Sequence, residues 1–206
     1  MSITEERESP YEIGVSTACT DGECGHLHRL IIDPTSRALT HLVIGKDVHS
    51  ARLVPISLVD TADADGVRLI CGTAEFDRLE PAEATEIIQP PAPTGSMPNN
   101  SGALGGYGGR SRTETVTYDR VPAGEVQLKA GERVHAADGD IGRVKGLVAA
   151  PDNHVTAILL TEGHLWSRKE VAVPISNVVD ATFGVQVDLT REEVKDLPPV
   201  DLTQIG

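Results

Sequence analysis

Short apolar runs separated by turn residues dominate both halves of the chain. In the second half, the runs richest in Val, Ile, Leu and Ala are residues 133–136, 141–149, 155–160, 169–174 and 184–188. Runs of this length, rich in β-branched side chains, predict strands that are buried on one or both faces. Pro174 is expected to end the fourth strand because proline has no backbone donor for the next ladder bond. The pattern predicts an all-β fold.

Each half is expected to close with one short helix. Thr190 and Glu193 match a capping box, in which each side chain satisfies a backbone N–H of the other residue. Prolines 198–199 should stop that helix. In the first half Gly72 stands where Thr190 does, so the helix predicted over 74–79 should be the weaker of the two.

The two halves are copies of each other. Residues 21–27 (DGECGHL) recur as 138–144 (DGDIGRV), an offset of 138 − 21 = 117, and the run VPIS occurs at 54–57 and again at 173–176. Solenoid repeats are only about 20 to 50 residues long, so this period indicates a duplicated domain. Two small domains are therefore expected.

The domain boundaries follow from composition. We expect a disordered N-terminus (1–10), domain 1 (11–88), a flexible Pro/Gly-rich linker (89–117), domain 2 (118–200) and a C-terminal tail (201–206). The linker has too few apolar residues to offset the entropy lost on ordering. The domains are predicted to fold independently, and proteases should cut first between residues 90 and 115.

Charge and composition limit the partners and the compartment. The net charge is −13, and both copies are acidic, at −9 for residues 1–90 and −5 for 118–206. Naked nucleic acid is an unlikely partner since its binding relies on Lys and Arg. No apolar run is long enough to span a bilayer, and the N-terminus lacks a secretory pattern. We therefore expect a cytoplasmic protein whose three cysteines stay reduced.

The order of motifs resembles one known family. An Asp-Gly-acid-x-Gly turn precedes an aliphatic strand, a Val-Pro-Ile-Ser run, Gly-Val and a Leu-Thr-x-Glu-Glu-Val helix. This order is similar to that of the PRC-barrel domain, found in reaction-centre H subunits and ribosome maturation factors. The resemblance covers about residues 13–80 and 125–198. It implies two small PRC-type β-barrels in tandem, each with a short C-terminal helix, and an interaction role, because the family has no common catalytic residues.

One hairpin gathers residues that metals favour. Zinc is bound by cysteine and histidine, and the residues here are Cys19, Cys24, His26 and His28. Their counterparts in the second copy are Ala136, Ile141, Arg143 and Lys145. Buried thiols acting as small hydrophobes, with the two histidines facing water, explain this pattern better than a metal site. No metal and no cofactor are predicted.

Two serines are candidate nucleophiles. Ser57 and Ser176 each follow Pro-Ile, but no histidine stands at matching places in the two copies. A nucleophilic serine needs a base and an orienting acid packed around it. The serines are therefore predicted to be turn residues whose hydroxyls bond nearby backbone. No catalytic residue is assigned, and the chain is not expected to be an enzyme.

A loop present in the second copy alone is the candidate partner-binding surface. Trp166 is the only tryptophan, and it lies in a longer, basic hairpin that the first copy lacks. Tryptophan and arginine are enriched in binding hot spots. The predicted binding residues are His164, Leu165, Trp166, Arg168 and Lys169. The alternative, that Trp166 folds back as a lid over a barrel, stays open.

The sequence thus predicts a non-catalytic tandem PRC-barrel protein that acts as a protein-binding or scaffold module. The alternative is an accessory assembly factor for a larger complex, either a ribosomal particle or a redox complex that transfers electrons. The partner is unknown. Docking of the two barrels on each other and formation of a homo-oligomer both stay open.

Overall fold

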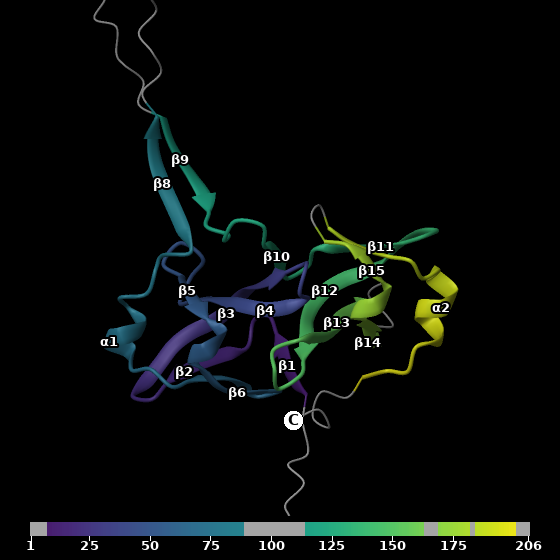
Figure 1. Cartoon of the computed structure of the whole chain (residues 1–206), viewed down its shortest axis with the longest axis horizontal. Coiled ribbons are helices and arrows are strands. Elements are labelled where there is room, and N and C mark those ends of the chain that lie inside the picture. Colours follow the sequence, from purple (N-terminus) through teal and green to yellow (C-terminus); the bar gives the residue numbers. More distant parts are fainter. Residues whose placement is uncertain (1–7, 89–113, 163–168, 182–183, 201–206) are drawn as a thin grey trace, which may run out of the picture. The chain divides into compact units, whose positions relative to one another are not determined.

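The computed structural model describes residues 8–88, 114–162, 169–181 and 184–200 (Figure 1). The chain forms two compact units. One comprises the residues up to Ala82 together with those from Arg120 onward, and so contains both copies. The other is residues 83–119.

The first copy supplies six strands of one sheet. These are β2 (Ser16–Cys19), β3 (Gly22–Asp33), β4 (Ala38–Gly45), β5 (Arg52–Pro55), β6 (Val59–Asp63) and β7 (Gly66–Leu69), with the 3-10 turn η1 (Ile56–Leu58) and the helix α1 (Thr73–Phe76). Their order in the sheet is β5-β4-β3-β2-β7-β6.

The second copy repeats this arrangement. Its strands are β11 (Arg133–Ala136), β12 (Gly139–Ala149), β13 (Val155–Glu162), β14 (Lys169–Pro174), β15 (Val178–Asp180) and β16 (Val185–Val187), with η2 (Ile175–Asn177) and α2 (Arg191–Asp196). The order β14-β13-β12-β11-β16-β15 matches that of the first sheet strand for strand. The all-β prediction is confirmed. Within the described residues both sheets are open. The first sheet has β5 and β6 as its edge strands, and the second has β14 and β15.

Each sheet gains its seventh strand from the other copy. Strand β1 (Ser9–Glu12) precedes the first copy but pairs antiparallel with β12, where Tyr11 lies opposite Leu147. Strand β10 (Val126–Lys129) precedes the second copy but pairs with β3, where Leu128 lies opposite Leu30. Because 128 − 11 and 147 − 30 both equal 117, the two exchanged strands occupy equivalent registers.

The tips of the two long hairpins also bond to each other. The amide of Leu39 donates to the carbonyl of Asn153 (2.9 Å), and the amide of Val155 donates to the carbonyl of Arg37 (2.8 Å). Arg37 and Asn153 both have positive φ, at 54° and 67°, a conformation uncommon outside glycine. The copies are thus held together by two strand pairs and by a symmetric pair of turns.

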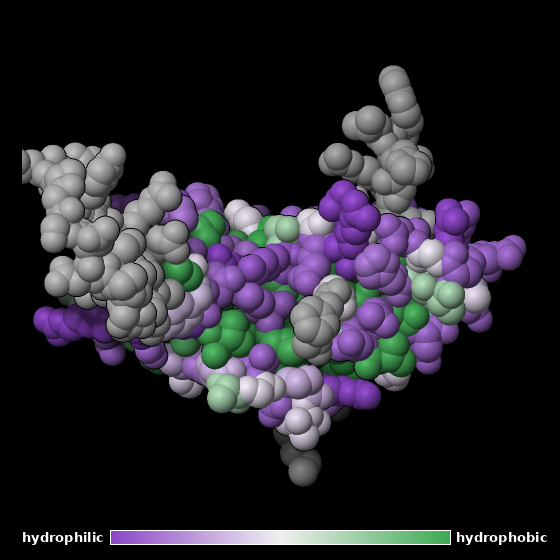
Figure 2. Space-filling model, turned by 90° about the horizontal axis from the view of Figure 1, so that it is seen from above, coloured by the Kyte–Doolittle hydropathy of each residue, from purple (hydrophilic) through white to green (hydrophobic). Residues whose placement is uncertain are grey.

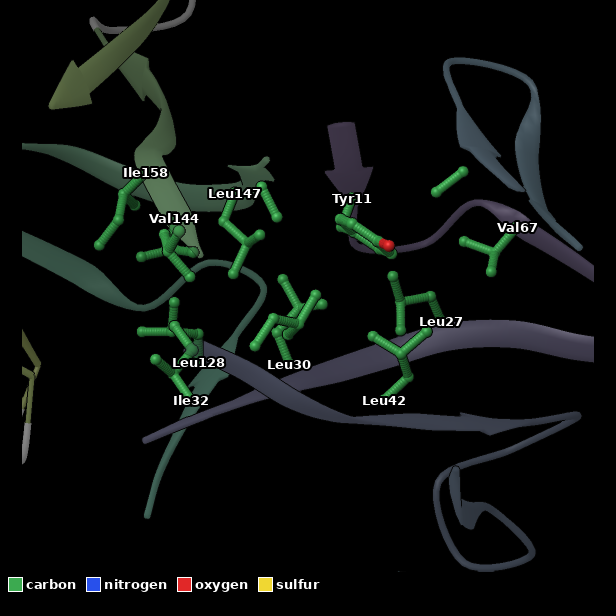
Figure 3. Close-up of a cluster of buried hydrophobic side chains, with 14 of the residues drawn as sticks. Tyr11, Leu27, Leu30, Ile32, Leu42, Val67, Leu128, Val144, Leu147 and Ile158 are labelled. Carbon is green, nitrogen blue, oxygen red and sulfur yellow. The ribbon is translucent and has the colours of Figure 1, made fainter. Parts of the chain in front are cut away.

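Both copies share one hydrophobic core. A single cluster of buried side chains includes Leu30 of β3, Leu128 of β10, Leu147 of β12 and Tyr11 of β1, and Figure 3 shows these side chains gathered together. Burial raises the pKa of Tyr11 to about 12, since desolvation disfavours the phenolate. Removing either exchanged strand would expose the core of the opposite copy.

The remaining unit is a hairpin. Strands β8 (Glu83–Ile88) and β9 (Glu114–Asp119) pair antiparallel from Glu83 and Asp119 to Ile88 and Glu114. Strand β9 begins within the segment 89–117 that the sequence suggests is linker, and β1 begins within the segment 1–10 expected to be disordered. Both strands have a partner in register, which composition alone does not reveal.

Both predicted helices are present, although α1 covers Thr73–Phe76 and not the predicted 74–79. Both halves of the capping box between Thr190 and Glu193 are formed, and α2 runs for six residues. Helix α1 has four residues and no side-chain cap from Gly72. The Asp of each Asp-Gly turn supports the helix of its own copy, since Asp21 accepts from the amide of Thr73 (2.7 Å) and Asp138 from the amide of Arg191 (2.8 Å).

None of the helices in the described ranges is long and apolar enough to cross a membrane. Figure 2 shows one face of the molecule, on which hydrophilic side chains are interspersed with smaller hydrophobic patches.

Candidate binding cleft

A half-open cleft of about 780 Å³ lies beside α2 in the second copy. Strand β12 and helix α2 supply most of its lining, and the end of β1 completes it from the other copy. Its apolar lining residues are Ile13, Ala130, Ile141 and Val144. The cleft therefore exists in this form only because β1 is exchanged.

The lining is basic although the protein is strongly acidic. Its five cationic residues are Arg133, Arg143, Lys145, Arg191 and Lys195, and its two carboxylates are Glu12 and Asp140. The difference, 5 − 2, gives the lining a formal charge of +3, against −13 for the whole chain. Such a local reversal of sign concentrates anions at the cleft.

Two of the cations are neutralised by carboxylates. The ammonium of Lys145 lies 3.1 Å from Glu12 and 2.6 Å from Glu170. Burial alone would favour the neutral amine and lower its pKa, but the hydrogen bonds that the ammonium donates to both carboxylates outweigh burial and raise the pKa of Lys145. Arg133 lies 3.6 Å from Asp140, whose other oxygen is 2.5 Å from His135.

The other three cations have no carboxylate partner among the described residues. Arg143 donates to the carbonyl of Gly131 (2.7 Å) through one nitrogen only, which leaves the rest of its guanidinium available. The side chains of Arg191 and Lys195 are exposed and form no hydrogen bond or ion pair within the described ranges. These three residues are the anion-binding candidates.

Local interactions fix the helix that presents Arg191 and Lys195. The capping box and Asp138 hold its first turn. Hydrogen bonds from the Thr190 backbone and side chain lower the pKa of Glu193, so the cap stays ionised. At the other end Lys169 donates to the carbonyls of Lys195 (2.8 Å) and Leu197, which would otherwise be orphan groups of the last turn.

The first copy has a different set of residues at the matching places. Arg133, Arg143, Arg191 and Lys195 correspond to Ser16, His26, Thr73 and Asp77. None of the four is a permanent cation, and one is a carboxylate. The fold therefore does not need a basic cluster beside its helix. The basic cluster of the second copy must have a role other than folding.

Only one of the five predicted binding residues lies within the described residues. His164, Leu165, Trp166 and Arg168 lie outside the described residues. Lys169 is described, and its ammonium bonds the end of α2. The cleft cations were not predicted as a site, although comparing the two copies position by position would have indicated them.

The cysteine prediction needs a correction. Cys19 and Cys24 form a disulfide, with Cα atoms 5.9 Å apart, whereas the sequence suggested that all three cysteines stay reduced. The β2–β3 hairpin places both side chains in the core, at 8% and 4% exposure. Cys71 is free and buried, and desolvation raises its pKa. Burial of all three cysteines is confirmed.

Two of the remaining metal and nucleophile candidates, His28 and Ser176, have contacts of their own. His26 is exposed as predicted, while His28 is half-buried and its Nε2 lies 2.9 Å from the carbonyl oxygen of Gly45. Across the described ranges, no group of three or more His, Cys, Asp or Glu side chains could hold a metal ion.

Ser57 and Ser176 lie in η1 and η2. The hydroxyl of Ser176 bonds the Asn177 side chain (3.4 Å), whereas a bond to nearby backbone was predicted.

No protein-family model matches the chain, and no curated protein is significantly similar to it in sequence.

Proposed function

We propose that this protein is a non-catalytic binding or scaffold module, built from two PRC-type barrel domains, whose partner is another protein. The observation that supports the proposal is the basic cleft of the second copy, since equivalent positions of the first copy show that the fold does not require those cations. Two domains that share a core and exchange strands form a scaffold on which a binding surface is held rigidly, and this rigidity lowers the entropic cost of association.

One residue of the predicted binding segment contacts the helix that lines the cleft. Lys169, the described end of that segment, contacts the carbonyl ends of α2, and α2 supplies Arg191 and Lys195 to the cleft. We therefore propose that Lys169 and the cleft belong to one interaction surface, while the other predicted binding residues lie outside the described ranges. Trp166 and Arg168 supply the residue types of a hot spot, and the cleft supplies the charge.

Affinity purification from native lysate, followed by quantitative mass spectrometry, tests the proposal. The bait is the full chain in three forms: unaltered, Arg191→Glu/Lys195→Glu, and Arg68→Glu/Arg78→Glu. The last variant is a matched control, because Arg68 and Arg78 are exposed residues of the first copy and the net charge changes equally. We expect one stoichiometric partner, lost only with the cleft variant.

Other outcomes decide between the remaining functions. Recovery of many small-subunit ribosomal proteins, or of a redox complex, would favour the accessory assembly factor. A partner recovered equally by all three baits would contradict the cleft as binding site. The Trp166→Ala/Arg168→Ala variant tests the hairpin in the same way, and we expect it to weaken partner binding by about 2 kcal/mol or more.

A further inference from the structure

The charge and shape of the cleft indicate the chemistry of its occupant. We propose that the cleft binds a short acidic peptide segment of the partner, through carboxylates that bridge Arg143 on β12 and the Arg191–Lys195 face of α2. This inference rests on the proposed function, since it names the kind of partner surface that the binding module accepts.

The available cations come from two elements that line the cleft, β12 and α2. Arg191 and Lys195 are four residues apart on a helix, so their side chains emerge on the same face about one turn apart. The side chain of Arg191 lies along the Asp138-Gly139 turn, where a Cβ added to Gly139 would be 3.6 Å from its Cδ. Arg143 lines the same cleft from a different element. A ligand with a single charge cannot engage both walls as well as one with two or more.

The arginines of the cleft suit carboxylates as ligands. A guanidinium presents paired N–H donors in a plane, which suits the two oxygens of a carboxylate. Arg191 is not held by any described acid, and Arg143 has one nitrogen engaged by a carbonyl. Within the cleft, Glu12 and Asp140 already pair with the other two cations. The incoming carboxylates therefore meet arginines that the fold has left without an acidic partner.

The volume and the lining of the cleft limit the size and the chemical nature of the ligand. A volume of about 780 Å³ lies within the range of sites that enclose part of a ligand or a few side chains. Among the apolar lining residues, Ile13 is half-buried and can pack against the aliphatic parts of glutamate or of neighbouring apolar residues, whereas Ile141 and Val144 belong to the core, at 8% and 3% exposure. A long nucleic acid would extend past the cleft over copies that are each net acidic, and would be repelled there. A short peptide avoids that repulsion.

Fluorescence anisotropy with a fluorescein-labelled peptide of six glutamates tests the proposal on the full chain. We expect saturable binding that weakens as salt is raised, because the contacts are solvent-accessible charge pairs. The Arg191→Glu/Lys195→Glu variant should weaken binding tenfold or more, and Arg68→Glu/Arg78→Glu should change it less than twofold. Circular dichroism and urea unfolding confirm that both variants remain folded. A milder variant, Arg191→Gln/Lys195→Gln, should weaken binding in the same direction.

Three competitors define the class of ligand. Unlabelled hexaglutamate should displace the probe, whereas inorganic phosphate at equal ionic strength and a single-stranded oligothymidylate should not. Displacement by phosphate or by the oligonucleotide at lower concentration than hexaglutamate would overturn the assignment to carboxylates. Equal binding of the probe to all variants would also overturn it. If a partner is captured through the cleft in the lysate experiment while hexaglutamate does not bind, the binding-module proposal stands and the acidic-peptide inference fails.

Discussion

The two copies have the same strand order and the same Asp-to-helix contact, yet they differ where the helix meets the long hairpin. The second copy gathers Arg143, Arg191 and Lys195 there, while the first has His26, Thr73 and Asp77. The comparison also extends to the core, where a disulfide in the first copy corresponds to Ala136 and Ile141 in the second. Features present in both copies build the fold, and features present in one are candidates for function or for local stabilisation.

The largest expected effect is that the two copies stay associated after the chain between them is cut. A protease site inserted between residues 95 and 99 allows the chain to be cut after folding. We expect the two fragments to stay together as a one-to-one complex in size-exclusion chromatography, since each fragment contributes a strand to the sheet of the other.

The same experiment tests the sequence-based expectation of independent domains. If the fragments elute separately and each retains its β-sheet circular dichroism, the copies fold alone and the strand exchange is not needed for stability. Separation in urea followed by remixing gives the control for reversible association.

The second prediction distinguishes the two exchanged strands. Gly146 faces β1 so closely that an added Cβ would lie 2.1 Å from the Tyr11 carbonyl oxygen, whereas Arg29 occupies the matching position opposite β10. Gly146→Ala should therefore displace β1 and destabilise the protein by about 3 kcal/mol or more. Urea unfolding measures the change.

Gly22→Ala is the matched control, because its Cβ would make only an ordinary contact, 3.5 Å from Thr73. We expect that variant to cost less than about 1 kcal/mol. Equal stability of the two variants would show that β1 does not pack against β12 as closely as described.

The third prediction uses the one ionisable residue of the exchanged strands that is buried in the core. Tyr11 has a pKa of about 12 in the folded protein and about 10 when unfolded. Between pH 10 and 12 the unfolded chain loses this proton and the folded chain retains it, so stability falls as pH rises, by about 2 to 3 kcal/mol in total. The counterpart of Tyr11, Leu128, does not titrate.

Tyr11→Phe should therefore remove that part of the alkaline loss while changing stability little at pH 7. Chemical unfolding at pH 8, 10 and 11 measures the difference between the variant and the unaltered chain. Parallel pH profiles of the two proteins would argue that Tyr11 is exposed to solvent.

The smallest expected effect concerns the disulfide. Cys19→Ala/Cys24→Ile installs the residues of the second copy, and it should cost about 2 kcal/mol, the chain-entropy value for closing a loop of about six residues. Thiol titration of the unfolded, unreduced protein should give one thiol, from Cys71, and three after reduction. Three thiols before reduction, in protein purified with its thiols protected, would restore the expectation of reduced cysteines for a cytosolic protein.

The local pattern of apolar and turn residues was sufficient to predict several secondary-structure elements. Aliphatic runs bounded by turn residues predicted β11 and β14 with their observed limits, and Thr190 with Glu193 predicted the cap of α2. These features depend on residues close in sequence, so the sequence determines them. The 117-residue offset likewise predicted two copies, and the structure gives them matching strand orders.

The partner of each strand was decided only in three dimensions. Backbone N–H and C=O groups are the same at every strand edge, so alternation in residues 9–12 or 126–129 does not reveal which copy they join. Burial of Tyr11 and Leu128 in the opposite copy, and the close approach allowed by Gly146, select the exchanged arrangement.

The cleft depended on tertiary structure for a related reason. Arg143 and Arg191 are 48 positions apart, and they line the same cleft because Asp138 ties α2 to the turn that begins β12. The sequence by itself determined several strands of the second copy, the duplication, the helix cap and the overall negative charge. Tertiary structure decided which edges pair, which cysteines bond and which cations converge, because each of these depends on distances between residues that the chain brings together only when it folds.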